Sequence, residues 1–259
     1  MVRKVLRQMT KLVLTSALAA AAILCAYISA TKSIQFPTEE DINRFTNVGA
    51  SLSSAETTAV VRSRQSAVQV MSLDLNDGGI SASSGTYVKY KGKYFVLTTS
   101  HGVGDVCGLT QIIADDVLYD CVAYVLRNPQ TDYIIIQIDQ IPERTPVEIP
   151  AHIPHSHQWA QDISTQTTIF YTGFPNEGGP YTFDGKIVGY KEGEAIFVDS
   201  YGWSGSSGSG VFSDNGKLIG YVMALEVGET YFGRQVLENF MWVIPLFKVD
   251  WIAAGAFAD

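Results

Sequence analysis

Short runs that alternate apolar and polar positions dominate the chain from Ser66 onward. The runs are rich in β-branched and aromatic residues, and Gly, Asn and Asp separate them, which is typical of an all-β sandwich or barrel. Two hairpins stand out, residues 86–99 around Lys91-Gly92-Lys93 and residues 211–225 around Asn215-Gly216. Further strands are expected at residues 109–114, 118–126, 132–138, 167–171, 186–190, 195–198 and 240–244.

A Pro-rich stretch at residues 141–153 divides these strands into two groups of similar size. The division predicts two small barrels, at about residues 66–146 and 164–246, within one globular unit at residues 65–259. The apolar spacing of the last fourteen residues, 246–259, suits a short amphipathic helix, which we expect to lie on the second barrel.

The N-terminal segment follows a different pattern. Residues 12–31 are an almost unbroken apolar or small run between Lys11 and Lys32. A spanning helix needs about 20 such residues, so residues 1–30 fit a signal anchor slightly better than a cleaved signal peptide. The basic flank should stay cytoplasmic, which puts the rest of the chain outside the cytoplasm, either anchored in the membrane or secreted after cleavage. Residues 31–64 are polar and predict a mobile stalk with room for one short helix.

Charge narrows the possible partners. Five of the 18 basic residues lie in the first 32, which hold no acidic residue, so the remainder carries 13 basic against 26 acidic residues and a net charge of −13. A surface of that sign repels phosphate backbones, and we expect no nucleic-acid partner.

The cysteines and histidines raise the questions of a disulfide and of a metal site. Cys107 and Cys121 are fourteen residues apart, and they could form a disulfide in an oxidising compartment or remain two buried thiols. Three histidines with a proline among them are more typical of a solvated loop than of a metal site. We expect neither a metal nor a cofactor, because no phosphate loop, nucleotide fingerprint or calcium loop occurs. The three histidines are His152, His155 and His157.

Amide hydrolysis needs a nucleophile, a base, an acid that holds the base, and donors for the oxyanion. His101 follows an apolar strand, and Asp132 opens the largely apolar run DYIIIQID. Ser207 lies in the glycine-dense turn GSSGSGVF. Glycine lets such a turn aim the N–H groups of Gly205 and Ser207 at one point, as an oxyanion hole requires.

The order His, Asp, Ser resembles that of the chymotrypsin-like serine proteases. TTSHGV is similar to their TAAH signature, DYIIIQI to their acid motif and GSSGSGVF to their nucleophile motif, at intervals of 31 and 75 residues that resemble the compact HtrA-type and viral members. The similarity covers about residues 66–250 and implies two six-stranded antiparallel β-barrels. It also implies catalytic roles for His101, Asp132 and Ser207, an oxyanion hole at Gly205 and Ser207, and a substrate pocket. The pocket residues by similarity are Tyr201, Met223, Ala224, Leu225 and Trp242.

The chain departs from the family pattern in several places. Ser206 replaces the Asp that pairs with a freshly cut N-terminus in trypsin relatives, and no Ile-Val-Gly-Gly start exists, so we expect no zymogen activation of that type. The bulkier Tyr133 follows the acid, and we expect no PDZ domain. Because the pocket residues are uncharged apart from nearby Glu226, an apolar or small side chain before the cut is favoured.

Alternatives remain for individual residues. GWSG at residues 202–205 also satisfies the nucleophile pattern, but the spacing onward to the next strand favours Ser207 over Ser204, and Ser209 fits least well. Three carboxylates in an expected hairpin turn could replace Asp132 as the group that orients the base. They are Asp115, Asp116 and Asp120.

The sequence therefore predicts a serine endopeptidase that acts on protein or peptide substrates through an acyl-enzyme. Two other functions use the same fold. One is a catalytically silent binding module, and the other is a maturation protease that acts in cis on a viral or particle protein. Activity against external substrates would separate the maturation protease from a general quality-control enzyme.

Overall fold

The computed structural model describes residues 52–75, 78–151, 153, 163–191, 194–230 and 233–257, and for residues 224–230, 233–238 and 257 it describes the main chain alone. The predicted signal anchor at residues 1–30, most of the stalk and His152, His155 and His157 lie outside these ranges. No helix within them has the length and apolar character that crossing a membrane would require.

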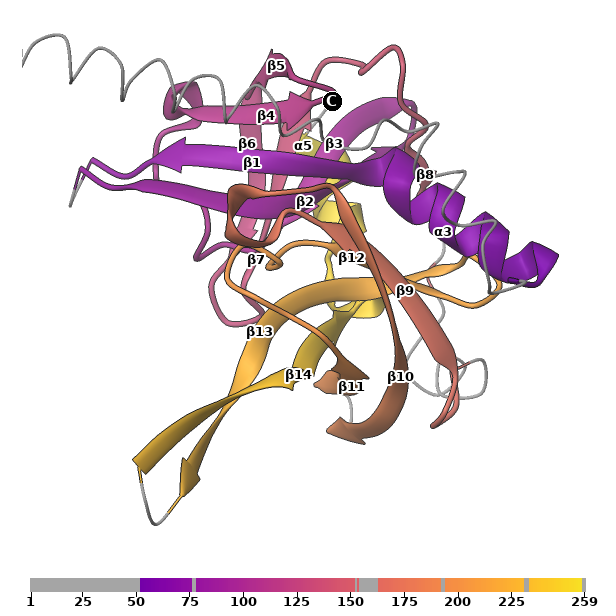
Figure 1. Cartoon of the computed structure of the whole chain (residues 1–259). Helices are drawn as coiled ribbons and strands as arrows, with labels where there is room; N and C mark the ends of the chain where they lie inside the picture. Colours follow the sequence, from indigo (N-terminus) through magenta and orange to yellow (C-terminus); the bar gives the residue numbers. More distant parts are fainter. Residues whose placement is uncertain are drawn as a thin grey trace, which may run out of the picture. The chain divides into compact units, whose positions relative to one another are not determined.

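The described elements run through the chain as follows (Figure 1). They are α3 (Ser54–Ser66), β1 (Ala67–Leu73), β2 (Ile80–Tyr90), β3 (Lys93–Thr98), η1 (Cys107–Leu109), β4 (Thr110–Ala114), β5 (Val117–Asp120), β6 (Ala123–Asn128), β7 (Tyr133–Ile138), β8 (Val147–Glu148), β9 (Thr168–Gly173), η2 (Pro175–Glu177), β10 (Tyr181–Lys191), β11 (Ala195–Ser200), β12 (Gly210–Ser213), β13 (Leu218–Thr230), β14 (Gly233–Pro245), η3 (Leu246–Lys248) and α5 (Trp251–Phe257).

The first group of strands forms a sheet that does not close among the described residues. Its order is β5-β4-β1-β2-β3-β7-β6, with β8 pairing β2 in parallel. The prediction of a closed, wholly antiparallel six-stranded barrel is therefore wrong here. β5 has only four residues, none of them buried, and its pairing is with β4 alone, so it offers little to a partner on its other edge. The expected single strand at residues 118–126 is two strands, β5 and β6. Between them lies Cys121, which forms a disulfide with Cys107.

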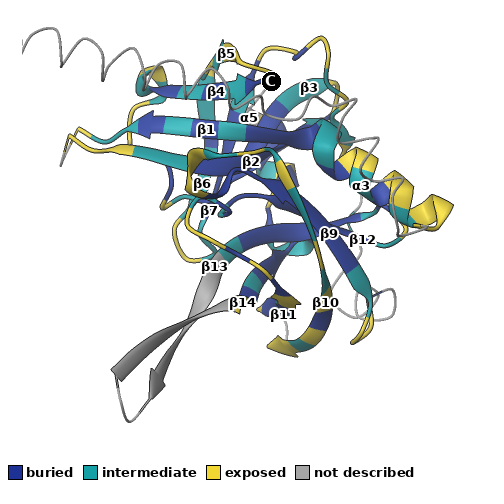
Figure 2. Cartoon of the chain, viewed as in Figure 1, coloured by how far each residue is buried: buried dark blue, intermediate teal, exposed yellow. Residues whose placement is uncertain are grey.

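The second group closes into a six-stranded barrel in the order β10-β11-β14-β13-β12-β9, as predicted. Buried aromatic and aliphatic side chains fill it, among them Tyr171, Phe212 and Tyr221, each fully buried. Figure 2 shows buried positions along the strands of both groups, while the outer end of α3 is exposed. Burial of this apolar area is the main term that stabilises the fold.

Helix α3 occupies the end of the segment expected to be a mobile stalk, and it is docked. A capping box begins it, because Ser53 Oγ accepts from the Glu56 N–H while the Glu56 carboxylate accepts from the Ser53 N–H. Its buried Ser63 donates to Thr172 Oγ1 of β9 at 2.6 Å. The folded unit thus begins near Leu52, ahead of Ser66.

The C-terminal helix exists but lies on the first group of strands, which corrects the expected position on the second barrel. The Trp251 ring packs on Tyr90 of β2 with centroids 5.8 Å apart, and the Asp250 N–H donates to the Tyr133 hydroxyl of β7. The large buried Trp251 decides the position, because the apolar surface that it covers belongs to β2 and its neighbours.

Candidate active site

His101 and Asp132 come together where two neighbouring strands begin and end. His101 follows β3, and Asp132 precedes β7, the antiparallel neighbour of β3. Asp132 Oδ1 accepts from the His101 main-chain N–H at 2.9 Å, and Oδ2 lies 2.6 Å from His101 Nδ1. Asp132 has φ +50°, a left-handed conformation that costs a non-glycine residue energy. Its carbonyl also accepts from the Ser100 N–H, so three hydrogen bonds hold this conformation.

The pairing changes the acid–base behaviour of the histidine. The hydrogen bond with Asp132 raises the pKa of His101 above its ordinary value, and the negative charge of Asp132 adds to the rise, whereas desolvation opposes it. The imidazole is 54% exposed and the Asp132 side chain 20%, so the ring can reach a substrate while its partner is sheltered.

Ser207 lies in a sharp turn that only glycine allows. Gly205 and Gly208 have φ +94° and +89°, and a Cβ on Gly208 would meet the Ser84 carbonyl at 2.0 Å. The Ser207 hydroxyl donates to the Met223 carbonyl of β13 at 3.1 Å. No hydrogen bond joins it to His101 in the described part of the chain.

Strand β2, which belongs to the first group of strands, forms hydrogen bonds to this turn. The Ser84 N–H donates to the Ser207 carbonyl at 2.9 Å, and Ser84 Oγ donates to the Gly205 carbonyl at 2.7 Å. Thr86 Oγ1 donates to the Gly208 carbonyl at 3.1 Å. Three carbonyls of the turn are thereby occupied, and the turn is fixed against β2.

The N–H groups of Gly205 and Ser207 have no acceptor among the described residues, whereas those of Ser206, Gly208 and Ser209 each donate to a carbonyl. The Ser204 carbonyl accepts from the Asn176 N–H at 2.7 Å. Because a trans peptide places its C=O and N–H on opposite sides, the Gly205 N–H points away from Asn176. Two free donors beside a serine are what an oxyanion requires.

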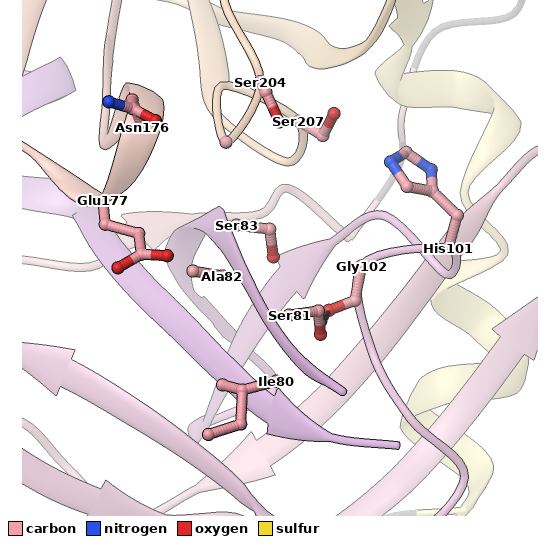
Figure 3. Close-up of a pocket in the computed structure, with 11 residues that line it drawn as sticks. Ile80, Ser81, Ala82, Ser83, His101, Gly102, Asn176, Glu177, Ser204 and Ser207 are labelled. Carbon is pink, nitrogen blue, oxygen red and sulfur yellow. Dashed lines mark hydrogen bonds between the residues drawn. The ribbon is translucent and has the colours of Figure 1, made fainter. Parts of the chain in front are cut away.

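A cavity of about 370 Å³ opens beside these groups (Figure 3). His101, Ser207 and Gly205 are among the residues that line it. The rest of its lining is formed by Ile80, Ser81, Ala82, Ser83, Gly102, Asn176, Glu177 and Ser204. Volumes of 300–1,000 Å³ are usual for ligand pockets.

Three of the five residues expected to form the substrate pocket, Tyr201, Met223 and Trp242, are not among the described residues that line this cavity. Tyr201 is exposed beside the turn, and its carbonyl accepts from the buried Tyr171 hydroxyl, whose pKa burial raises, so that this hydroxyl stays neutral. Met223 supplies the carbonyl that holds Ser207. The Trp242 ring packs edge-on against Phe197. Ala224 and Leu225 continue β13, and their side chains are outside the described part.

The alternative carboxylates and serines from the sequence analysis lie in different parts of the structure. Asp115 pairs with Arg144 at 2.6 Å, and Asp120 accepts from Gln111, so neither orients His101. Ser209 is fully buried. Ser204 does line the cavity, so two of the three candidate nucleophiles, Ser204 and Ser207, share it with His101.

Sequence reasoning missed Asn176 and Glu177. Both have left-handed backbones, with φ +51° and +62°, and both line the cavity. The dipeptide Pro175-Asn176 predicts a turn there, but it does not predict that the turn contacts the nucleophile loop. Within the described residues no group of His, Cys, Asp and Glu could hold a metal ion.

Comparison with known proteins identifies the family and the fold. The family model of the trypsin-like peptidase domain matches residues 83–220, whereas no curated protein matches. Among solved structures, a serine endoprotease from Yersinia pestis superposes with a TM-score of 0.61 at 19% identity, covering 80% of this chain and 68% of the other. The HtrA-type protease AlgW with tripeptide superposes with a TM-score of 0.55 at 18% identity, covering 74% of this chain and 60% of the other. The family match spans more than half of the sequence, and the chain therefore belongs to the trypsin-like peptidases, the chymotrypsin-like serine proteases.

Proposed function

We propose that the chain is a serine endopeptidase in which Ser207 is the nucleophile, His101 the general base and Asp132 the group that orients the base. The observation that carries the proposal is the two-point contact of the Asp132 carboxylate with His101, beside a cavity that Ser207 and Gly205 share with His101. Protein or peptide substrates follow from membership of the peptidase family.

In the proposed reaction, Ser207 Oγ attacks the scissile carbonyl and its proton passes to Nε2 of His101. The Asp132 carboxylate accepts from Nδ1–H, which leaves Nε2 free to take that proton, and it stabilises the imidazolium that forms. The free N–H groups of Gly205 and Ser207 would bind the oxyanion, and one such donor contributes about 2.7–4 kcal/mol in other enzymes. His101 then gives its proton to the leaving amine, and water hydrolyses the acyl-enzyme by the same route in reverse.

One observation favours a catalytically silent binding module instead. The Ser207 hydroxyl donates to the Met223 carbonyl rather than to His101. A neutral hydrogen bond of this kind contributes about 0.5–1.5 kcal/mol, so rotation about one side-chain bond can release the hydroxyl at small cost. Catalytic hydrogen bonds are often loose in unliganded enzymes, and we therefore favour the peptidase.

Labelling with a fluorophosphonate probe separates the two functions, because the probe reacts only with an activated serine. We expect the folded fragment 52–259 to be labelled, and Ser207→Ala and His101→Ala to abolish labelling. Ser204→Ala is the matched control and should retain it. A folded wild type that is not labelled would favour the binding module, and labelling that depends on Ser204 would reassign the nucleophile.

We also propose that the protease domain lies outside the cytoplasm, anchored through residues 1–30 or secreted after their cleavage. The apolar run behind a basic start supports this position, as does the disulfide between Cys107 and Cys121, since disulfides persist in oxidising compartments. Fractionation of cells that express the full chain, with determination of its N-terminal residue, tests both parts. Recovery of the intact chain in the cytosol would contradict the proposal.

A further inference from the structure

The cavity beside Ser207 lies on the side of the site where the leaving part of a substrate must sit. His101 gives its proton to the leaving amine, so that amine has to lie next to His101. The cavity is lined by His101 and the following Gly102, and it extends from there along Ile80–Ser83 at the start of β2. Met223 and Tyr201, which the family resemblance assigns to the other side of the cut, do not line it.

The carboxylate of Glu177 lies at this cavity. Glu177 is the single acidic residue among the residues that line it, all of which belong to the described part of the chain, and His101 is its single basic group. Figure 3 shows the Glu177 side chain on the rim opposite His101. The other described residues that line the cavity are serine, glycine, alanine, isoleucine and asparagine, so His101 is the one further ionisable side chain among them.

The backbone holds Glu177 in this position at an energetic cost. Asn176 and Glu177 are consecutive non-glycine residues with positive φ, and such conformations persist only where surrounding contacts fix them. Those contacts are the Asn176 N–H to the Ser204 carbonyl and the Gly178 N–H to the Pro175 carbonyl. The first of them ties the Glu177 turn directly to the nucleophile loop.

The wall of the cavity also contains an unsatisfied polar group. Ser83 is 3% exposed, and its hydroxyl has no hydrogen-bond partner among the described residues, whereas the neighbouring Ser81 donates to the Gly102 carbonyl. Buried hydroxyls without partners are rare in native proteins, which makes Ser83 an unusual feature of this wall.

We propose that Glu177 makes this protease prefer substrates with Lys or Arg at one of the two positions that follow the scissile bond. A cationic side chain in the cavity would face a carboxylate that has no other charged neighbour there. An acidic side chain would meet that carboxylate and be disfavoured. The inference rests on the proposed peptidase function and adds the chemical class of the leaving segment.

Mapping of cleavage sites in a denatured protein mixture by mass spectrometry tests the inference, because the mixture offers every side chain at each position around the cut. The compared proteins are the wild type, Glu177→Gln, Glu177→Lys and the control Glu143→Gln, which removes one exposed negative charge outside the cavity lining. Separate samples of each protein are labelled with the fluorophosphonate and melted, so that loss of the nucleophile or of the fold is detected apart from the cleavage assay.

In the wild type we expect Lys and Arg to exceed Asp and Glu by about threefold to tenfold at one of these two positions, relative to their abundance in the mixture, as single ion pairs near a surface allow. Glu177→Gln should abolish the excess, Glu177→Lys should invert it, and Glu143→Gln should keep it. Added salt should reduce it, because exposed charges are screened.

The outcomes separate this inference from the proposed function. A wild type that is labelled and cuts, but shows no excess of basic residues after the bond or the same excess in Glu177→Gln, overturns the role of Glu177 alone. A wild type that is neither labelled nor able to cut overturns both. Labelling without any cleavage of protein also overturns the inference, because no leaving segment is then selected.

Discussion

Replacing Asp132 with Asn tests how the protein fixes the proton of His101. The carboxylate makes two contacts, one to the His101 main-chain N–H and one to Nδ1. The main-chain N–H can only donate, so the amide oxygen of Asn must occupy the Oδ1 position. The amide NH₂ then faces Nδ1 and forces this nitrogen to accept, which moves the imidazole proton to Nε2. A histidine protonated there cannot take the proton of Ser207.

The size of the effect follows from the same two contacts. Turning the amide so that its oxygen faces Nδ1 would leave the His101 main-chain N–H against a second donor and unsatisfied. That costs about 1–3 kcal/mol, so the productive orientation is about 5- to 150-fold less populated. The charge that stabilises the imidazolium is lost as well. Together these effects agree with the loss of about 10⁴-fold that this substitution causes in another Ser-His-Asp protease.

The assay is the rate constant for fluorophosphonate labelling, measured with the thermal unfolding midpoint. We expect Asp132→Asn to reduce labelling by about 10³- to 10⁴-fold while the midpoint moves little, because Asn keeps two hydrogen bonds and the main-chain shape. The exposed Asp139→Asn in the same region is the control and should label at the wild-type rate. Labelling of folded Asp132→Asn at the wild-type rate would refute the reasoning, since the assigned orienting group would then be unnecessary.

Three further predictions use other parts of the site and the fold. Because Asp132 raises the pKa of His101, labelling should increase with pH around a midpoint above the ordinary imidazole value of 6.5, and a midpoint at or below 6.5 in a pH series would contradict that assignment. Gly205→Ala would put a Cβ 2.7 Å from the Phe174 carbonyl at φ +94°, so labelling should fall by about 10²-fold or more while circular dichroism keeps the native spectrum. The double substitution Cys107→Ser and Cys121→Ser opens a fourteen-residue loop and should lower the free energy of unfolding in urea by about 3 kcal/mol, whereas an unchanged value would show that the disulfide constrains little.

Features set by neighbouring residues were predictable from the sequence. The hairpins around Gly92 and Gly216 are confirmed, because positive-φ glycines at those turns carry a local signal. The ends of β3 and β7 also follow from apolar runs, and they bring His101 and Asp132 to the same end of an antiparallel pair. That pairing is why two residues 31 positions apart could be expected to meet.

The closure of the first sheet and the position of α5 were not predictable, because they depend on strand edges and on packing between elements. Strand count suggested a closed first barrel, but closure needs a hydrogen-bonded partner for both edges, and β5 is too short and exposed to provide one. The apolar spacing of α5 predicted a helix without specifying which surface it covers. Trp251 packs on Tyr90, and no periodicity within the last fourteen residues contains that information.

The relation between the nucleophile turn and the base depends on contacts that the sequence pattern does not contain. Ser84 and Thr86 of β2 hold the carbonyls of Gly205 and Gly208 across 121 and 122 residues, and Tyr221 of β13 donates to the Thr131 carbonyl, next to Asp132, across 90 residues. Each contact joins one group of strands to the other. The motifs therefore determine which chemical groups are present, whereas β2 and Tyr221 determine how far apart these groups are. It follows that substitutions at Ser84 and Thr86, outside every motif, should impair labelling of Ser207 by displacing its turn.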